Sequence, residues 1–330
     1  MLDVRSPGEY AQGHIPSAVS FPLFSDDERS QVGTCYKRQG RDAAVELGLS
    51  LGSPKLLEFV KSAKALGTDR HLRVHCWRGG MRSSSMGWLL ETAGFQVTLL
   101  TGGYKAFRHW VLATFEHPQS IVILGGMTGT GKTAVLTALA AQDAQILDLE
   151  RWANHRGSSY GSLGLPPQPS TEHFENEIAL QWRHLNPQQP VWIEAESRRI
   201  GVCRVPQALF QRMMAATVLE IQRPRSERIA LLEKEYGTAN PADLIAATDR
   251  LRKHLGGLRT QEAIDHIHQG NLAAAIDLVL DYYDKTYRYD LEKRHVSIHT
   301  VNIAGLDPAQ SAALLLEKTQ RMLEKCWIPS

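Results

Sequence analysis

Cysteine is scarce in this sequence, and the four residues (Cys35, Cys76, Cys203 and Cys326) stand far apart in a chain of 330. Such spacing indicates neither a zinc site nor a disulfide framework. No apolar run approaches the roughly 18 residues that a membrane span requires, and no signal peptide opens the chain. A working thiol must stay reduced, as it does in the cytoplasm. We therefore expect a soluble, cytoplasmic protein that does not associate with membranes.

Charge of one sign is not in excess either, since 37 Lys and Arg residues balance 35 Asp and Glu residues to a net charge of +2. A nucleic-acid surface would thus have to come from local clusters. The length exceeds that of a single typical core, so two domains are expected. We place them at residues 1–115 and 120–330. The polar connector between them contains Pro118, which would end a preceding helix.

Short apolar runs alternate with helical spacing, which predicts an α/β fold with parallel, doubly wound sheets. In the first domain we expect strands at 2–4, 72–75 and 97–100 and helices at 54–66 and 83–93. In the second we expect strands at 121–124, 146–148, 191–194 and 218–221, and a mainly helical region from 206 onward. Residues 154–170, rich in Gly, Ser and Pro, predict a long functional loop.

The first motif is His-Cys-Trp-Arg-Gly-Gly-Met-Arg-Ser at residues 75–83, between a predicted strand and a predicted helix. A thiol at such a turn meets backbone N–H groups and the positive end of the helix dipole, and both lower its pKa. The glycines let the loop curl into an anion nest. Cys76, Arg78 and Arg82 are therefore the candidate catalytic residues. The alternative is a buried structural cysteine beside incidental arginines.

The second motif is Gly126-Met-Thr-Gly129-Thr-Gly131-Lys132-Thr133, which follows a predicted strand and satisfies the phosphate-loop pattern in full. Its glycines allow backbone N–H groups to approach phosphate oxygens, Lys132 adds positive charge, and Thr133 could hold Mg²⁺. Asp148 and Glu194 at strand ends are candidate metal partners or general bases; the alternative for either is a solvated carboxylate. The loop predicts binding of a diphosphate-like group and leaves open whether ATP or GTP is ever bound.

The first domain resembles the rhodanese family. The resemblance rests on Asp3-Val4-Arg5, Gly13-His14-Ile15-Pro16, the Cys76 loop and Gly102-Gly103-Tyr104. Similar enzymes carry a persulfide or perselenide on the cysteine. The Cys76 loop is one residue longer than the common form of the family, which suggests a tetrahedral oxyanion such as selenophosphate. Similar domains also begin earlier, so this one is expected to be N-terminally short.

The whole chain resembles the tRNA 2-selenouridine synthase family, in which a rhodanese-like domain precedes a P-loop domain with a helical C-terminal part. The resemblance implies replacement of sulfur by selenium in 2-thiouridine at the tRNA wobble position. Geranyl diphosphate would first alkylate the sulfur, and selenium from selenophosphate, free or delivered by its synthetase, would then displace the geranylthio group. No tightly bound cofactor or resident metal is implied. Cys76 would act in the selenium step, as carrier or as nucleophile.

Further polar residues are candidates for contact with tRNA or another substrate. They are His155, Arg156, Ser158, Arg198 and Arg199. Basic runs at 223–228 and 250–259 are weighed as tRNA-binding surfaces, although such runs are more often solvated faces. Two other functions remain as alternatives: a P-loop small-molecule kinase with a regulatory rhodanese-like domain, and a cysteine phosphatase that uses the longer loop after Cys76.

Overall fold

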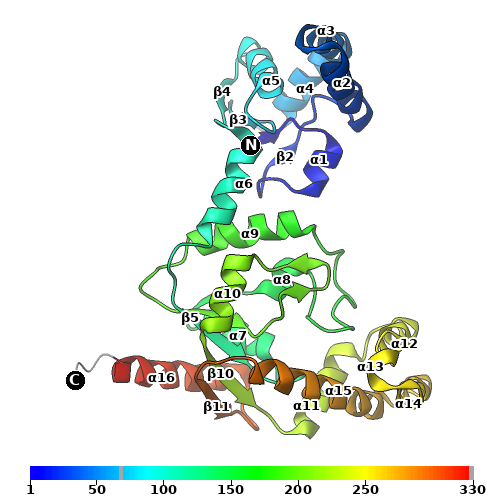
Figure 1. Ribbon diagram of the computed structural model, residues 1–330, viewed down its shortest axis with the longest axis vertical. Helices are drawn as coiled ribbons and strands as arrows, with labels where there is room; N and C mark the ends of the chain where they lie inside the picture. Colours follow the sequence, from blue (N-terminus) through cyan, green and yellow to red (C-terminus); the bar gives the residue numbers. More distant parts are fainter. Residues whose placement is uncertain (67–69, 327–330) are drawn as a thin grey trace. The chain divides into compact units, whose positions relative to one another are not determined.

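The computed structural model describes residues 1–66 and 70–326, which form two compact units (Figure 1). The N-terminal unit contains Met1–Thr114 together with Glu172–Ala179. The C-terminal unit contains Phe115–Thr171 and the described residues from Leu180 on. The grouping of Glu172–Ala179 with the N-terminal unit was not anticipated from the sequence. It reflects side-chain contacts such as the 2.8 Å hydrogen bond from the Tyr104 hydroxyl to Glu172.

A parallel sheet of four strands organises the N-terminal unit, in the order β2-β1-β3-β4. The strands are β1 (Leu2–Asp3), β2 (Val19–Ser20), β3 (His71–His75) and β4 (Gln96–Leu99). The predicted strands at 2–4, 72–75 and 97–100 are confirmed, whereas β2 was missed because it is two exposed residues long and carries no apolar pattern. The pairing of Asp3 with His75 brings the start of the chain beside the strand that leads to Cys76.

Helices surround this sheet and enclose one hydrophobic core. They are α1 (Pro7–Gln12), α2 (Asp26–Gln39), α3 (Arg41–Gly52), α4 (Leu56–Ala65), α5 (Met81–Thr92) and α6 (Gly103–Thr114), with a short 3₁₀ turn η1 (Ser53–Lys55). The core combines Val4 and Val74 from the strand region with Phe59, Met86 and Leu90 from the helices. Cys76 belongs to the same cluster, so the thiol lies at the edge of packed apolar side chains.

Five parallel strands form the sheet of the C-terminal unit, in the order β11-β10-β5-β7-β6. They are β5 (Ile121–Gly125), β6 (Gln145–Leu147), β7 (Val191–Glu194), β10 (Thr217–Gln222) and β11 (Ile298–Asn302). The first four were predicted, and β11 lies within the region expected to be helical. The central strand β5 is almost wholly buried, as its continuous apolar run predicts. An antiparallel pair, β8 (Arg199–Ile200) and β9 (Cys203–Arg204), lies outside this sheet.

Most of the remaining C-terminal unit is helical, as predicted. Its helices are α7 (Lys132–Ala140), α8 (Leu149–Ala153), α10 (Gln207–Ala215), α11 (Arg225–Tyr236), α12 (Pro241–Asp249), α13 (Arg252–Leu255), α14 (Gly257–His268), α15 (Leu272–Glu292) and α16 (Pro308–Cys326). Helix α9 (Thr171–Arg183) contributes residues to both units. Helices α12 to α15 gather beside one another, yellow to orange in Figure 1, around a second apolar cluster.

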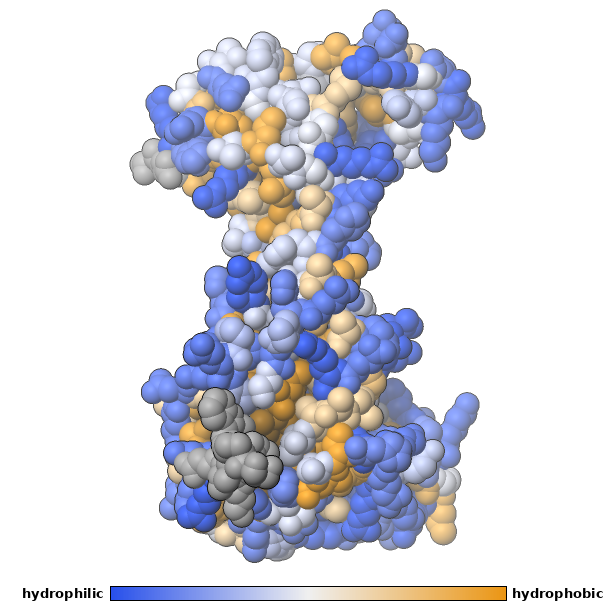
Figure 2. All heavy atoms as spheres, turned by 60° about the vertical axis from the view of Figure 1, so that its left-hand side comes forward, coloured by the Kyte–Doolittle hydropathy of each residue, from blue (hydrophilic) through white to orange (hydrophobic). Residues whose placement is uncertain are grey.

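The loop at 154–170 contains turns and no helix or strand, in agreement with its composition. Figure 2 shows a face on which hydrophilic side chains cover much of each unit, with hydrophobic residues in separate patches. Within the described part of the chain, no helix combines the length and apolar character needed to cross a membrane. Together these units provide two strand–loop–helix turns, one after β3 and one after β5.

Candidate active sites

The thiol loop connects β3 to α5 and is held in place by the segment that begins α6. Backbone N–H groups of Tyr104 and Lys105 donate to the carbonyls of Cys76 and Trp77 at 2.9 and 2.8 Å. Gly103 approaches so closely that an added Cβ would lie 2.3 Å from the Cys76 carbonyl oxygen. Gly79 has a φ of +67°, which favours glycine. The Gly-Gly-Tyr motif therefore fixes the shape of the Cys76 loop.

Neutral hydrogen-bond donors determine the ionisation of Cys76. Burial alone raises the pKa of this thiol, since only 3% of the residue is exposed. The Ser83 hydroxyl, 3.2 Å from the sulfur, and the backbone N–H groups of Arg78 and Ser83 more than offset burial, so the net pKa is lowered. The charge of Arg82 adds to this lowering. The loop thus stabilises a thiolate. Ser83 was not singled out as a functional residue from the sequence.

The two arginines of the motif act on Cys76 in different ways. Arg78 is exposed and assists the thiolate through its backbone N–H rather than through its charge. Arg82 donates to Glu9 at 2.7 Å, so its guanidinium is partly neutralised. Glu9 comes from α1, far away in sequence, and no local pattern predicts this pairing. A ligand of the Cys76 loop would therefore bind mainly to backbone N–H groups, because the charge of Arg82 is already paired with Glu9.

Beneath the loop lies a buried ion pair. Arg5 donates to both carboxylate oxygens of Asp3, with the shortest distance 2.6 Å, and to the carbonyl of Gly13 at 2.7 Å. Its guanidinium also lies 3.8 Å from the centre of the Tyr104 ring. Because both charges are fully buried, removing either would leave the other uncompensated. The Asp-Val-Arg motif is therefore a support that joins the first strand, the Gly13 turn and the α6 segment.

The phosphate loop follows β5 and leads into α7. Gly126, Gly129 and Gly131 have φ values of +153°, +82° and +84°, which side chains with a Cβ rarely adopt. A Cβ on Gly129 would also meet Leu232 at 2.9 Å. The Lys132 ammonium donates to the Gly126 carbonyl at 3.0 Å, which keeps the side chain curled over the loop. The geometry agrees with an anion-binding turn at a helix N-terminus.

Three carboxylates gather beside this loop. Oxygen atoms of Glu150, Glu194 and Glu196 lie within 4.8 Å of one another, and the Thr133 hydroxyl donates to Glu150 at 3.2 Å. Burial and mutual repulsion raise the pKa of Glu150 and Glu194 well above the ordinary carboxyl range, although Lys132 opposes the shift. One oxygen of Glu194, a residue only 2% exposed, has no hydrogen-bond partner. The cluster therefore favours the protonated form of these carboxyls, and Lys132 compensates their charge only in part.

This cluster corrects part of the sequence interpretation. Glu194 belongs to it, whereas Asp148 does not: its carboxylate accepts from the Arg151 N–H at 2.9 Å and caps α8. Glu150, two residues further along the chain, lies next to Thr133. Glu150 and Glu196 were not singled out, since no spacing rule joins residues that meet only because β6 and β7 are neighbours.

The donor set fits a divalent cation. Carboxylate and hydroxyl oxygens are the ligands that Mg²⁺ prefers. A cation bound here would give the unpartnered oxygen of Glu194 a ligand bond. Thr133, Glu150, Glu194 and Glu196 could hold it, directly or through water. Such a cation would neutralise negative charge on a bound diphosphate.

A cavity of about 590 Å³ opens beside the phosphate loop and the carboxylates. Its walls carry both charge and apolar surface. Lys132, Arg156 and Arg198 supply cations, while Phe210, Met214, Leu291 and several tyrosines supply apolar surface. A site of this size and composition suits a small anionic ligand with a hydrophobic part.

The other residues predicted for substrate contact divide into two groups. Ser158 and Arg198 line the cavity, as does Arg156, which also pairs with Glu235 at 2.7 Å. His155 does not line it; its ring packs against Gly161, and burial lowers its pKa. Arg199 lies exposed on β8, outside the cavity lining.

The basic run at 223–228 is largely engaged within the protein. Arg223 pairs with Glu227, and Arg225 pairs with Asp277 and Asp281. Arg228 is buried, binds both carboxylate oxygens of Asp284 and donates to the Thr128 carbonyl at 2.8 Å. This run therefore supports the phosphate loop and the helices beside it, rather than forming a free surface for nucleic acid.

Comparisons with known proteins agree with the two units. A rhodanese-like domain model matches residues 1–109, and a model described as the tRNA 2-selenouridine synthase AAA domain matches residues 119–305. Curated proteins named tRNA 2-selenouridine synthase are also similar. That of Marinobacter nauticus is 36% identical over 90% of this chain and 90% of its own. That of Salmonella schwarzengrund is 36% identical over 90% of this chain and 91% of its own.

A crystal structure of an N-terminal domain from Clostridium difficile 630 is 44% identical in the aligned part, covering 34% of this chain and 87% of that one, with a TM-score of 0.32. The family assignment rests instead on the matches that span most of the chain. With a rhodanese-like domain followed by an AAA domain described for these enzymes, and relatives 36% identical over 90% of its length, this chain belongs to the tRNA 2-selenouridine synthase family.

Proposed function

We propose that the protein is a tRNA-modifying transferase that replaces sulfur by selenium in 2-thiouridine at the wobble position. Geranyl diphosphate serves as alkyl donor and selenophosphate as selenium donor. The observation that carries this proposal is the cavity of the C-terminal unit, which joins a phosphate loop and a carboxylate cluster to apolar walls. The family's name supports tRNA as the substrate.

In the first step the thiocarbonyl sulfur of the uridine attacks the first carbon of the geranyl chain. A sulfur–carbon bond forms, the carbon–oxygen bond to the diphosphate breaks, and pyrophosphate leaves. Lys132 and the loop N–H groups stabilise the negative charge that develops on the departing pyrophosphate. Geranylation matters because the thiocarbonyl is a poor leaving group and its S-alkyl form is a good one.

In the second step selenium from selenophosphate bonds to the uridine ring carbon that carries the S-geranyl group. The bond between this carbon and sulfur breaks, and geranylthiol leaves. Water supplies the oxygen that converts the remaining phosphoryl group to phosphate. Cys76 acts in this step, since its loop combines a thiol of lowered pKa with backbone N–H groups suited to an oxyanion. The two steps thus use different chemistry and different loops of the chain.

The test is mass spectrometry of nucleosides from 2-thiouridine tRNA incubated with the protein, first with geranyl diphosphate and Mg²⁺, then with selenophosphate. We expect the gain of one geranyl group, followed by its replacement by selenium. An unchanged nucleoside, with protein shown to be folded by circular dichroism, would overturn the proposal. Phosphate transfer from ATP to a small molecule that persists in Cys76→Ala would favour the kinase alternative instead.

A further inference from the structure

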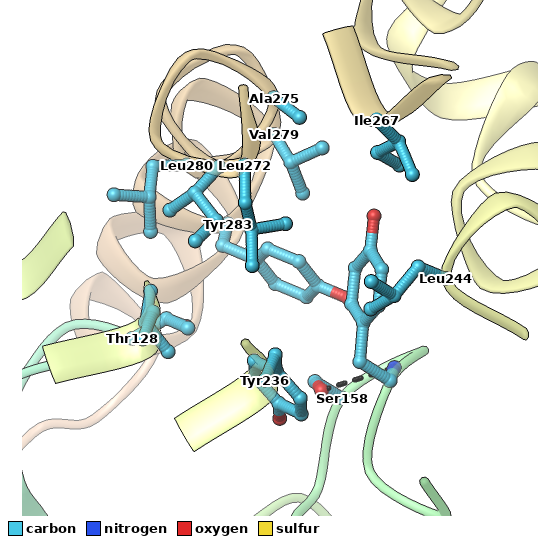
Figure 3. A pocket seen from close by; sticks show the side chains of 13 residues that line it. Thr128, Ser158, Tyr236, Leu244, Ile267, Leu272, Ala275, Val279, Leu280 and Tyr283 are labelled. Atoms are coloured by element: carbon cyan, nitrogen blue, oxygen red, sulfur yellow. Dashed lines mark hydrogen bonds between the residues drawn. The ribbon is translucent and has the colours of Figure 1, made fainter. Parts of the chain in front are cut away.

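A second, smaller pocket lies against the phosphate-loop cavity in the C-terminal unit. Helices α12, α14 and α15 form its walls, and Figure 3 shows Leu244, Ile267, Leu272 and Val279 from these helices around it. Thr128 of the phosphate loop and Ser158 lie at its other side. The pocket and the larger cavity share Thr128, Ser158, Leu232, Tyr236 and Tyr283, so they are adjacent.

The lining offers hydrocarbon and few hydrogen-bonding groups. The Tyr283 hydroxyl accepts from the Ser159 N–H at 2.9 Å, and the Tyr160 hydroxyl bonds to Thr248 at 2.7 Å. Ser158 in turn accepts from the Tyr160 N–H at 3.2 Å. With these polar atoms already engaged, their rings and the aliphatic side chains present apolar surface. A nucleobase, which needs donors and acceptors at its edge, would lose its hydrogen bonds to water there.

The dimensions agree with the end of a slender chain. The pocket has a volume of about 40 Å³, compared with about 10–15 Å³ that one water-sized group requires on the same measure. This space suits a branched hydrocarbon end and is too small for a purine with its sugar. The adjoining cavity of about 590 Å³ has room for the diphosphate and the nearer part of the chain.

We propose that the apolar pocket between α12, α14 and α15 binds the far end of the prenyl chain and thereby sets the chain length that the enzyme accepts. This inference rests on the proposed function and adds the binding position of the donor's hydrocarbon part. The free energy comes from removing apolar surface from water, while the phosphate loop binds the other end of the same molecule.

Ala275 allows a sharp test, because it lies in the pocket lining on α15 and is 3% exposed. Ala275→Leu would fill the pocket. The same substitution at Ala273, two residues away on the same helix and outside the lining, is the matched control. Dissociation constants for dimethylallyl, geranyl and farnesyl diphosphate and for inorganic pyrophosphate are measured by calorimetry with Mg²⁺ present.

We expect Ala275→Leu to raise the dissociation constant of geranyl diphosphate about tenfold, the effect of excluding two methylene-sized groups from the pocket. The dissociation constant of pyrophosphate should stay unchanged. Ala273→Leu should match the wild type. Leu272→Ala enlarges the pocket and should shift preference toward farnesyl diphosphate, which keeps the test decisive if Ala275→Leu fails to fold. Equal chain-length preference in wild type and both pocket variants, with pyrophosphate still bound, would overturn the inference.

The same variants separate this inference from the proposed function. If the wild type transfers geranyl to tRNA but its chain-length preference is the same in the Ala275 and Leu272 variants, the proposed function stands and the assignment of the pocket is rejected. Chain-length-dependent binding that changes in the variants, with no transfer to 2-thiouridine tRNA, would retain the pocket and reject the function.

Discussion

The thiol loop and the phosphate loop are built on the same plan yet handle negative charge in opposite ways. Each follows a parallel strand, turns through glycine at positive φ and enters a helix. The thiol loop closes around one sulfur atom, which neutral donors stabilise. The phosphate loop opens into a large cavity whose lining includes both Lys132 and three carboxylates.

The comparison shows that the turn geometry and the surrounding charges each contribute to stabilising negative charge. One hydroxyl and backbone N–H groups at a helix N-terminus stabilise a single anionic atom. A ligand with several charges needs mobile cations as well, and the uncompensated carboxylates next to Thr133 suit a divalent cation that arrives with it. Variants that affect one loop alone can therefore test whether the two act independently.

The largest expected effect comes from Cys76→Ser. Replacing the thiol should abolish selenium incorporation and leave S-geranylation intact, because the phosphate loop does not use the sulfur. Nucleoside mass spectrometry measures both products in one digest. Cys35→Ser, at a partly buried cysteine on α2, is the matched control and should behave as wild type. Loss of both steps in a folded Cys76→Ser protein would contradict the independence of the two loops.

Lys132→Ala should reduce geranyl transfer by about 10²–10³-fold, since in the proposed mechanism it removes the positive charge that stabilises the departing pyrophosphate. The tRNA should remain as 2-thiouridine, while the thiolate absorbance of Cys76 stays unchanged. Lys318→Ala on α16 removes the same charge elsewhere and serves as control. Normal formation of the S-geranyl product in Lys132→Ala would reject the assignment of this loop.

The carboxylate cluster predicts that stability depends on pH when no divalent cation is present. Folding raises the pKa of Glu194, chiefly by burial, so the folded chain retains a proton that the unfolded chain releases. Above the unfolded value of about 4.3, the free energy of unfolding of the C-terminal unit should fall as pH rises, by up to about 1.4 kcal/mol per pH unit for one proton.

Glu194→Gln should reduce this dependence, because the amide does not ionise, while Glu150 and Glu196, whose pKa values are also raised, keep their contributions. Thermal melts in EDTA between pH 5 and pH 8 measure it, and added pyrophosphate identifies the transition of the C-terminal unit. Glu233→Gln, an exposed position on α11, should retain the wild-type slope. Mg²⁺ should restore stability at the higher pH in wild type more than in Glu194→Gln. Identical slopes in wild type and Glu194→Gln would argue against an uncompensated cluster.

Ser83→Ala should have the smallest effect. Loss of the hydroxyl 3.2 Å from the sulfur removes one of the groups that lower the pKa of Cys76. The midpoint of the thiolate absorbance should move to higher pH, and selenium incorporation at neutral pH should slow by less than about tenfold, the weight of one hydrogen bond. Ser83→Thr retains the hydroxyl and should restore the midpoint. An unchanged midpoint in Ser83→Ala would show that backbone donors alone hold the thiolate.

Sequence patterns predicted those parts of the two sites that are formed by one continuous strand–loop–helix segment. The runs before Cys76 and Gly126 are strongly apolar, and the glycines after them require turns, so strand, loop and helix followed directly from the sequence. The strands β2 and β11 were missed because the first is too short for a pattern and the second is mostly exposed or half-buried at the sheet edge.

Residues that meet across the fold could not be predicted in the same way. Glu150 and Glu196 join Glu194 because β6 pairs with β7, while the start of α8 turns Asp148 into a helix cap. Arg82 forms an ion pair with Glu9, and Arg228 forms one with Asp284; in each pair the two residues come from elements far apart in sequence. The free energy of such pairs depends on distance and burial, which no spacing rule supplies.

The sequence by itself determined the α/β architecture, the thiol of the first loop and the glycine-rich turn of the second, because backbone conformation and apolar periodicity are local properties. Only the tertiary structure decided which carboxylates lie near Thr133, which acidic residue pairs with Arg82, and that an apolar pocket adjoins the phosphate loop. Those features arise when separate elements pack together and exclude water, since burial changes both the cost of a charge and the affinity of a surface for hydrocarbon.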